Sequence, residues 1–350
     1  MSLGHFLYSI NGSRLKVAKF HFTLCPKDIN IYSCFIHLDK TKESIVKRAR
    51  VDCALITSKQ GQKMGSHATS NNRYFLPNPQ QAEDSFKHFQ FKSGENHLQI
   101  LAPSSSHVQI MFRYSGDQSL IQLLLLTDAL RRQGANVIDL CTPYFPGARQ
   151  DRVCNSGEPL SVKVYADLIN QQHYQKVCIF DPHSDVVVAL LDNVQVVKNH
   201  QFVRDVVNDL RSDFILVSPD AGSNKKIFEL SSQLGGSPVI RADKIRDVRN
   251  GAIIGTEIYC DDLSGKTAVI VDDICAGGRT FIELAKKLKA KNCKKIILLV
   301  SHYEGTADEK KLAESGIDAI YTTDSLPGFV ASEFLNVKNI WHFMPAQGEK

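Results

Sequence analysis

The sequence predicts an α/β protein built on mostly parallel sheet. From about Phe86 onward, short apolar strands alternate with helices of about ten residues, which is the pattern of βαβ units. Polar residues recur just after these strands, as Asp-Pro-His at 181–183, Ser-Pro-Asp at 218–220 and Asp-Asp at 272–273. Because ligands of open parallel sheets bind outside the carboxyl ends of the strands, we expect these residues to mark the ligand-binding edge.

Apolar runs and amphipathic patterns predict the individual elements in order. The helix at 118–132 is expected to end at Gly134, because glycine commonly stops a helix. The predicted strands are 108–112, 137–140, 177–180, 214–218, 238–240, 268–271, 295–300 and 319–322. The predicted helices are 118–132, 161–171, 202–210, 225–234, 281–290 and 307–315.

The pattern before Phe86 is weak. Residues 31–37 and 51–57 are weak strand candidates. Residues 58–81 are rich in Ser, Asn, Gln, Gly and Pro, which predicts a linker or loop.

Composition narrows the class of protein. A chain of 350 residues suggests two domains or one large α/β unit. No apolar run reaches membrane-spanning length, and no secretory signal is expected at the N-terminus, so we predict a protein without membrane segments. The net charge of +5 comes from basic residues interleaved with acids, which does not favour nucleic acid as a partner. Nine cysteines without a CxxC pair indicate reduced thiols and a cytoplasmic location.

The strongest chemical motif runs from 269 to 288 as strand, acidic pair, glycine loop and helix. The carboxylates of Asp272 and Asp273 can accept hydrogen bonds from two vicinal hydroxyls, as on a ribose. Gly277 and Gly278 allow the backbone to curl so that several N–H groups point at one anion.

The next two residues of this motif strengthen the prediction of a phosphate site. Thr280 is expected to cap the helix, and Arg279 adds a fork of donors suited to phosphate. The alternative is a plain strand, turn and capped helix without a ligand.

This motif resembles the phosphoribosyl-binding signature of type I phosphoribosyltransferases and of ribose-phosphate pyrophosphokinases. Further segments, in matching order, resemble the second family over the chain from about Phe86 to its end. They are Phe-Lys-Ser-Gly-Glu at 91–95, Pro-Tyr-Phe-Pro-Gly-Ala-Arg-Gln-Asp-Arg at 143–152, Phe-Asp-Pro-His at 180–183, Ser-Pro-Asp-Ala-Gly at 218–222 and Asp-Lys-Ile-Arg at 243–246.

The resemblance implies an ATP site. Arg149 and Gln150 would contact ATP, Glu95 would hold the adenine or its ribose, and Phe91 would offer a stacking surface. Ser93 stands where the family has an aspartate, which removes a charge near the adenine.

The resemblance also implies Mg²⁺ and two catalytic cations. His183 and Asp220 would contact Mg²⁺, which prefers oxygen ligands and keeps several waters. Lys244 and Arg246 would neutralise charge on the transferring group. The alternatives are a hydrogen-bonded loop histidine and a solvated charge run at 241–249.

The sugar side is implied in the same way. Asp272 and Asp273 would contact the ribose diol, while His302 would line the site or serve the structure. The loop for the 5-phosphate would comprise Ala276, Gly277, Gly278, Arg279 and Thr280.

This sugar-phosphate loop departs from the family pattern. Ala-Gly-Gly-Arg-Thr at 276–280 replaces the common Asp-Thr-Gly-Gly-Thr, and Arg279 makes the loop more positive. Ser223 stands for a glycine, and a basic pair shifts to 225–226. A more positive loop suits a longer or more anionic substituent on the ribose.

The resemblance therefore implies transfer of the β,γ-pyrophosphate of ATP to C1 of ribose 5-phosphate, giving phosphoribosyl pyrophosphate and AMP. Three further functions stay open: the same chemistry on ADP-ribose for NAD salvage, a type I phosphoribosyltransferase, and a catalytically weak regulatory homologue.

The implied architecture is two similar phosphoribosyltransferase-like domains in a homo-oligomer. We expect an N-terminal extension and linker at 1–80, an ATP-side domain at 81–200 and a ribose-phosphate-side domain at 201–350. Residues 91–95 of one chain would complete the site of a neighbour.

Overall fold

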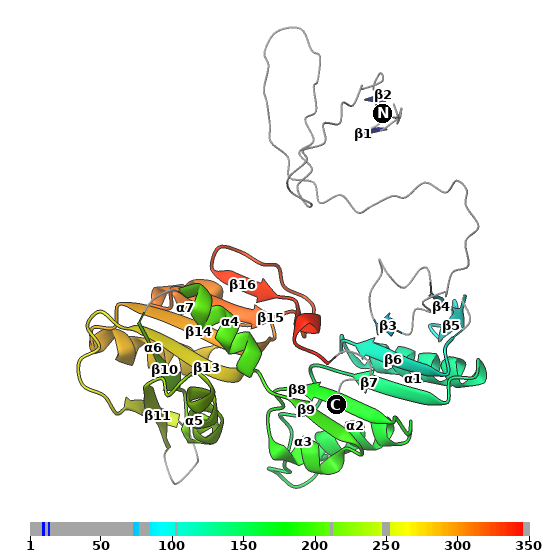
Figure 1. Ribbon diagram of the computed structural model, residues 1–350, viewed down its shortest axis with the longest axis horizontal. Helices are drawn as coiled ribbons and strands as arrows, with labels where there is room; N and C mark the ends of the chain where they lie inside the picture. Colours follow the sequence, from blue (N-terminus) through cyan, green and yellow to red (C-terminus); the bar gives the residue numbers. More distant parts are fainter. Residues whose placement is uncertain are drawn as a thin grey trace. The chain divides into compact units, whose positions relative to one another are not determined.

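The computed structural model describes residues 9–10, 13–14, 73–76, 85–101, 104–210, 213–246 and 253–345 (Figure 1), with the backbone alone described at 9–10, 13–14, 244–246 and 253–254. The chain divides into two units, 1–67 and 68–350. In the first unit the structure describes one antiparallel pair, β1 (Ser9–Ile10) and β2 (Ser13–Arg14). The strands predicted at 31–37 and 51–57 lie outside the described residues, as does most of the predicted linker.

The first large sheet has five parallel strands in the order β3-β6-β7-β8-β9. Helices α1 (Asp117–Arg132), α2 (Ser161–Asn170) and α3 (Asp185–Leu190) contribute Leu123, Val162 and Val187 to one shared apolar core with this sheet. The strands are β3 (Arg73–Leu76), β6 (His107–Phe112), β7 (Val137–Cys141), β8 (Lys176–Phe180) and β9 (Val194–Val197).

A separate antiparallel hairpin joins β4 (Phe86–Gln90) to β5 (Asn96–Ile100). Gly94 turns the chain between the two strands with a positive φ of 92°, a conformation that glycine adopts without steric cost. Phe86, Leu98 and Ile100 enter the same core as α1. The hairpin is therefore anchored on one side and carries its turn outward.

The second large sheet has seven strands in the order β12-β11-β10-β13-β14-β15-β16. All neighbours are parallel except β11 and β12, which run antiparallel. The strands are β10 (Phe214–Ser218), β11 (Val239–Arg246), β12 (Ile253–Ile258), β13 (Thr267–Cys275), β14 (Lys295–Tyr303), β15 (Ala319–Thr323) and β16 (Leu335–Lys338).

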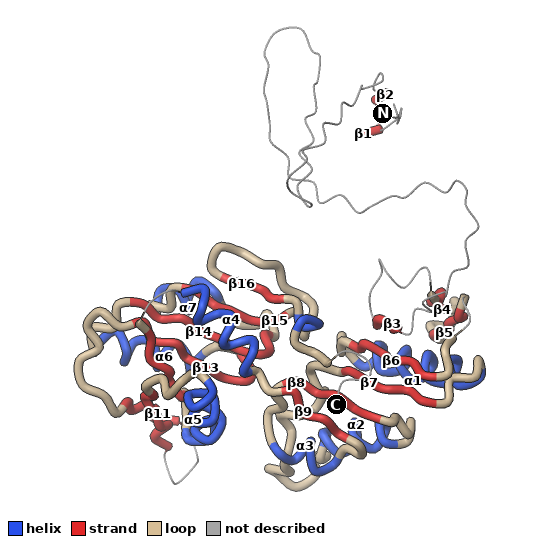
Figure 2. Tube along the Cα trace, viewed as in Figure 1, coloured by secondary structure: helices blue, strands red, loops and turns tan. Residues whose placement is uncertain are grey.

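Alternating residues of the second sheet face two different cores. Ile270 and Leu298 pack with helices α6 (Arg279–Ala290) and α7 (Glu309–Glu314) on one face. Val269 and Ile297 face the opposite way, as the two-residue period of a strand requires. Figure 2 shows the alternation of helices and strands that builds both sheets.

The core on this opposite face joins the two sheets. It is formed with α4 (His200–Leu210) and α5 (Asn224–Gln233), and it also contains Cys141 and Phe180 of the first sheet. Arg113, which follows β6, bonds Asp324 at 2.6 Å and lies 5.0 Å from the ring centre of Trp341. Trp341 belongs to the short helix η3 (Ile340–His342). Apolar packing and this polar contact therefore both connect the two halves of the second unit.

The predicted fold class, α/β with mainly parallel sheets flanked by helices, is confirmed. Helix α1 ends as predicted, because Gly134 follows it with a φ of 96°. Strand β3 lies inside the stretch predicted as a linker, and β9, β12 and β16 were not predicted. All four are edge strands, whose apolar runs are shorter or broken.

Candidate active site

Three residues predicted for different roles line one small pocket. Arg149 was predicted for ATP, His183 for Mg²⁺ and Asp273 for the ribose. The pocket, with room for about 10 Å³, roughly one water, is lined by Tyr144, Phe145, Ala148, Arg149, Pro182, His183, Asp273, Ile274 and His302. These residues follow β7 and β8 of the first sheet or belong to β13 and β14 of the second.

His183 and Asp273 form the polar centre of this pocket. His183 Nδ1 lies 2.7 Å from Asp273 Oδ2, across 90 residues of sequence. The hydrogen bond that His183 donates to Asp273 raises the pKa of His183 above its ordinary value, against the lowering effect of burial. Burial acts to raise the pKa of Asp273, but the hydrogen bond and charge of His183 outweigh it and hold that pKa low. Asp273 is therefore an ionised carboxylate with an orienting partner.

Asp272 has the opposite electrostatic character. Burial raises its pKa well above the usual carboxyl range, and repulsion from Asp273 and Asp220 adds to this effect. The backbone N–H of Asp273 donates to Asp272 Oδ1 at 3.0 Å. The acidic pair is thus divided into one readily ionised carboxyl and one that holds a proton more tightly.

The glycine loop after β13 has the geometry of an anion cradle. Gly278 has a φ of 74° and is the N-cap of α6, and no side chain caps this helix. A Cβ atom at Gly278 would lie 3.1 Å from Leu312 and 3.3 Å from Ala307. Gly277 is exposed, and a Cβ atom there would meet nothing within 4 Å. A helix N-terminus without a side-chain cap has N–H groups that an anion can bind.

The predicted cap at Thr280 is wrong. Helix α6 begins at Arg279, so Thr280 is already its second residue. The left-handed backbone of Gly278 starts the helix earlier than a threonine cap would. Arg279 is exposed, and among the described residues no ion pair holds it.

Asp220 is fixed by a residue that departs from the family pattern. It caps the short helix η2 (Ala221–Ser223) by accepting from the Ser223 N–H at 3.2 Å. The Ser223 hydroxyl in turn lies 2.7 Å from that of Ser218. Ser223 therefore orients the carboxylate predicted for Mg²⁺.

The sequence predicts Asp181 at the ligand-binding edge, within the Asp-Pro-His motif, but assigns this buried residue no specific role. Its carboxylate accepts from Ser301 at 2.5 Å, from Asn199 at 2.9 Å and from Lys226 at 3.1 Å. Burial acts to lower the pKa of Lys226, but attraction from Asp181 and Asp273 outweighs it and raises that pKa. Asp181 thus ties β8 to β14 and α5 beside the pocket. Its position directly after a strand was the available signal.

His302 both lines the pocket and supports the structure. It lies within β14, not after it as predicted. Its Nε2 lies 3.0 Å from the Phe180 carbonyl and must donate, so Nδ1 accepts from the Ser325 hydroxyl at 2.7 Å. Burial lowers the pKa of His302, which suits this neutral form. Its ring meets Tyr144 edge to face at 5.3 Å.

The other residues predicted to bind ATP do not line this pocket. Phe91, Ser93 and Glu95 form the turn of the β4–β5 hairpin, which contributes nothing to the pocket lining. The Ser93 hydroxyl donates to Glu95 at 2.5 Å, and the exposed Phe91 ring lies 5.4 Å from Phe89. Gln150 follows Arg149 and is exposed.

The predicted catalytic cations lie at the end of β11. Lys244 and Arg246 pair with Thr256 and Ile253 of β12 in the backbone register. Only the backbone of these two residues is described, so the positions of their side chains stay predictions.

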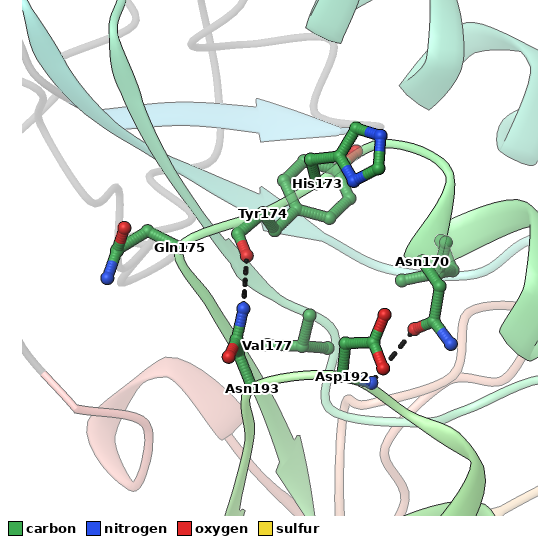
Figure 3. A pocket seen from close by; sticks show the side chains of 8 residues that line it. Asn170, His173, Tyr174, Gln175, Val177, Asp192 and Asn193 are labelled. Atoms are coloured by element: carbon green, nitrogen blue, oxygen red, sulfur yellow. Dashed lines mark hydrogen bonds between the residues drawn. The ribbon is translucent and has the colours of Figure 1, made fainter.

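A larger cavity of about 150 Å³ lies elsewhere and contains none of the predicted residues (Figure 3). It is found where β8 and β9 begin, at the opposite end of the strands from Asp181 and His183. Figure 3 shows the Asn193 amide directed at the Tyr174 carbonyl, at 3.1 Å. Its lining comprises Ile169, Asn170, His173, Tyr174, Gln175, Val177, Asp192 and Asn193.

The fold and the site together define a class. Parallel strands whose carboxyl ends carry an acidic pair, followed by a glycine cradle and a helix, are the arrangement of a phosphoribosyl-binding α/β protein. Residues 83–172 match the family model described as the N-terminal domain of ribose phosphate pyrophosphokinase. Residues 202–325 match the phosphoribosyl transferase domain.

Individual relatives agree with these matches. The ribose-phosphate pyrophosphokinase of Aquifex aeolicus is 33% identical over 250 residues, covering 68% of this chain and 78% of the relative. That of Thermosipho africanus is 33% identical over 224 residues, covering 60% and 67%. The chain belongs to the ribose-phosphate pyrophosphokinase family.

A solved structure supports the fold. The phosphoribosylpyrophosphate synthetase of Mycobacterium smegmatis superposes with a TM-score of 0.64 at 24% identity, covering 73% of this chain and 86% of that one. Among the described residues, no helix has the length and apolar character that crossing a membrane requires.

Proposed function

We propose that this protein transfers the β,γ-pyrophosphate of ATP to C1 of ribose 5-phosphate, giving phosphoribosyl pyrophosphate and AMP. The observation that carries the proposal is that Arg149, His183 and Asp273 line the same pocket. Family membership supports the reaction class, and the pocket supports the proposal because the proposed nucleotide contact Arg149 and the proposed sugar contact Asp273 both line it.

The proposed mechanism is direct displacement. Asp273, ionised and oriented by His183, accepts hydrogen bonds from the ribose diol, and Asp272 adds the second contact. The loop at 276–280 holds the 5-phosphate with backbone N–H groups and Arg279. The C1 hydroxyl then attacks the β-phosphorus, and AMP leaves. Positioning and charge neutralisation carry such a transfer, so no covalent intermediate is needed.

The residues present fit Mg²⁺. Because Nδ1 of His183 is bonded to Asp273, Nε2 would be the nitrogen left to hold a metal ion, and metal-bound histidines typically have such a carboxylate partner. Asp220 would supply an oxygen ligand. Mg²⁺ keeps several waters, so these two side chains would be enough if phosphate oxygens supplied further ligands. When bound, Mg²⁺ would neutralise polyphosphate charge.

Lys244 and Arg246 are proposed to act on the transferring pyrophosphoryl group. Their strand ends at Arg246, at the carboxyl end of the parallel strands, which is also the end that carries Asp272 and Asp273. Their role in stabilising the transition state rests on the family resemblance of the Asp-Lys-Ile-Arg segment.

The acceptor has one further candidate. Arg279 is exposed, and the structure shows no ion pair for it within the described residues, so it is available to a second phosphate. This favours ADP-ribose, which exposes the same C1 hydroxyl, as the competing acceptor.

A phosphoribosyltransferase and a regulatory homologue have less support. A phosphoribosyltransferase consumes the activated sugar and needs no ATP segment. A regulatory homologue has no need of an oriented His183–Asp273 pair, which this chain has.

Initial rates of AMP release test the acceptor. Purified protein would receive MgATP with either ribose 5-phosphate or ADP-ribose. We expect higher kcat/KM for ribose 5-phosphate. A clear preference for ADP-ribose would transfer the proposal to that acceptor, and no AMP with either would refute it.

The biological setting is proposed from the family resemblance. We propose a cytoplasmic homo-oligomer in which residues 91–95 of one subunit complete a neighbouring site. The exposed position of this hairpin turn, apart from the pocket of its own chain, supports that arrangement. The domain boundaries at 80 and 200 are proposed on the same grounds.

A further inference from the structure

The loop after β14 carries Glu304, whose carboxylate binds Arg149, the residue proposed to contact the nucleotide. Arg149 Nη1 donates to Glu304 Oε1 at 2.9 Å, across 155 residues of sequence. Their side chains are 40% and 25% exposed, so the ion pair lies at the rim of the pocket, where a dissolved anion can reach it. None of the motifs in the sequence includes Glu304.

The position of Glu304 is fixed from the sugar side. Its N–H donates to the Cys275 carbonyl at 3.0 Å, and Cys275 directly precedes the loop at 276–280. The charge of Glu304 also acts on Tyr144. Burial first, and then this charge, raises the pKa of that tyrosine. Glu304 is therefore held between the cation proposed for ATP and the loop proposed for the sugar phosphate.

The geometry points to a specificity role for Glu304: we propose that its carboxylate competes with the polyphosphate of the nucleotide for Arg149. This inference rests on the proposed function, because it takes ATP as the ligand of Arg149. A guanidinium offers a fork of donors that carboxylate and phosphate bind in the same way. Polyphosphate that binds Nη1 of Arg149 must therefore displace Glu304.

Because of this competition, a ligand would need more negative charge to bind Arg149. A triphosphate offers several anionic oxygens and can replace one carboxylate with a net gain. A monophosphate such as AMP gains little from the same exchange, so Glu304 would favour release of the product over release of ATP.

Isothermal titration calorimetry on the full chain, with Mg²⁺ present, tests this competition. Glu304→Gln keeps the size of the side chain and removes its charge. We expect it to bind ATP about two- to fivefold more tightly than the unaltered protein, which is the range of a partly exposed ion pair. In an Arg149→Ala background the same change should have no effect. Glu314→Gln, which removes a carboxylate paired with Lys310, is the matched control and should leave ATP affinity unchanged.

Two results would overturn the proposal. Weaker or unchanged ATP binding by Glu304→Gln would mean that Glu304 does not compete for Arg149. Tighter binding that persists without Arg149 would mean a general charge effect. Inorganic tripolyphosphate as a second probe separates this inference from the proposed function. If only tripolyphosphate binds, and Glu304→Gln tightens it, the competitor stands while the ATP assignment fails.

Discussion

At the residue scale, the chemistry depends on which groups of the site carry charge. The two neighbouring carboxyls of the acidic pair differ in pKa because His183 donates a hydrogen bond to Asp273. Burial and repulsion from other carboxylates instead raise the pKa of Asp272. The sequence identified both carboxyls, but it could not show this difference. His183 and Asp273 are 90 residues apart, and only the folded chain brings them together.

The His183–Asp273 pair predicts a defined pH dependence. The raised pKa of His183 means that its contribution to stability is fully present below about pH 6.5 and is lost as pH rises through the folded-state pKa. For Asp273, whose pKa is lowered, the contribution is present above about pH 4 and is lost as pH falls through its folded value. The pair is therefore most stabilising between about pH 4 and about pH 6.5, and its stabilisation falls as the pH moves from this range toward the folded pKa of either residue.

Histidine titration by NMR measures the first of these shifts. We expect the His183 ring to titrate above the ordinary histidine value in the native protein, and Asp273→Asn to bring the pKa down. His302, whose pKa burial lowers, is an internal reference that should titrate below that value. A His183 pKa at or below the ordinary value would show that the pair is not formed in solution.

At the scale of elements, the apolar pattern predicted strands buried on both faces and missed those at the sheet edges. Strands β13 and β14 carry long apolar runs and were predicted. Strands β9 (Val-Gln-Val-Val) and β16 (Leu-Asn-Val-Lys) are half-buried and short, so a polar residue breaks the run. The same limit applies to the helix start at Gly278, because the sequence does not show that its backbone is left-handed.

The two glycines of the cradle should respond differently to alanine. Gly278→Ala forces a Cβ atom into a left-handed backbone, which costs about 1–2 kcal/mol, and places it 3.1 Å from Leu312. Gly277 has no close neighbour, so Gly277→Ala should change stability by less than about 0.5 kcal/mol. Thermal unfolding midpoints measure both. Equal midpoints for the two variants would contradict the geometry of this loop.

At the scale of the whole molecule, the site is assembled from two sheets. Arg149 and His183 follow strands of the first sheet, and Asp273 and His302 lie on the second. Buried contacts keep these strand ends together, including the bond from His302 to the Phe180 carbonyl and that from Ser301 to Asp181. Sequence motifs predicted most of these residues individually. They gave Asp181 no specific role and did not include Glu304, because the contacts of both residues cross from one sheet to the other.

Phosphorus NMR of the protein with MgATP and ribose 5-phosphate tests the central claim most directly. If the pocket transfers pyrophosphate as a unit, the three ATP signals should be replaced by AMP and by two coupled diphosphate signals on the sugar. Asp273→Asn should slow this conversion by at least about tenfold, since it removes the charge that His183 orients. Formation of ADP or free pyrophosphate without a sugar diphosphate, or an unchanged rate in the Asp273→Asn variant, would contradict the account.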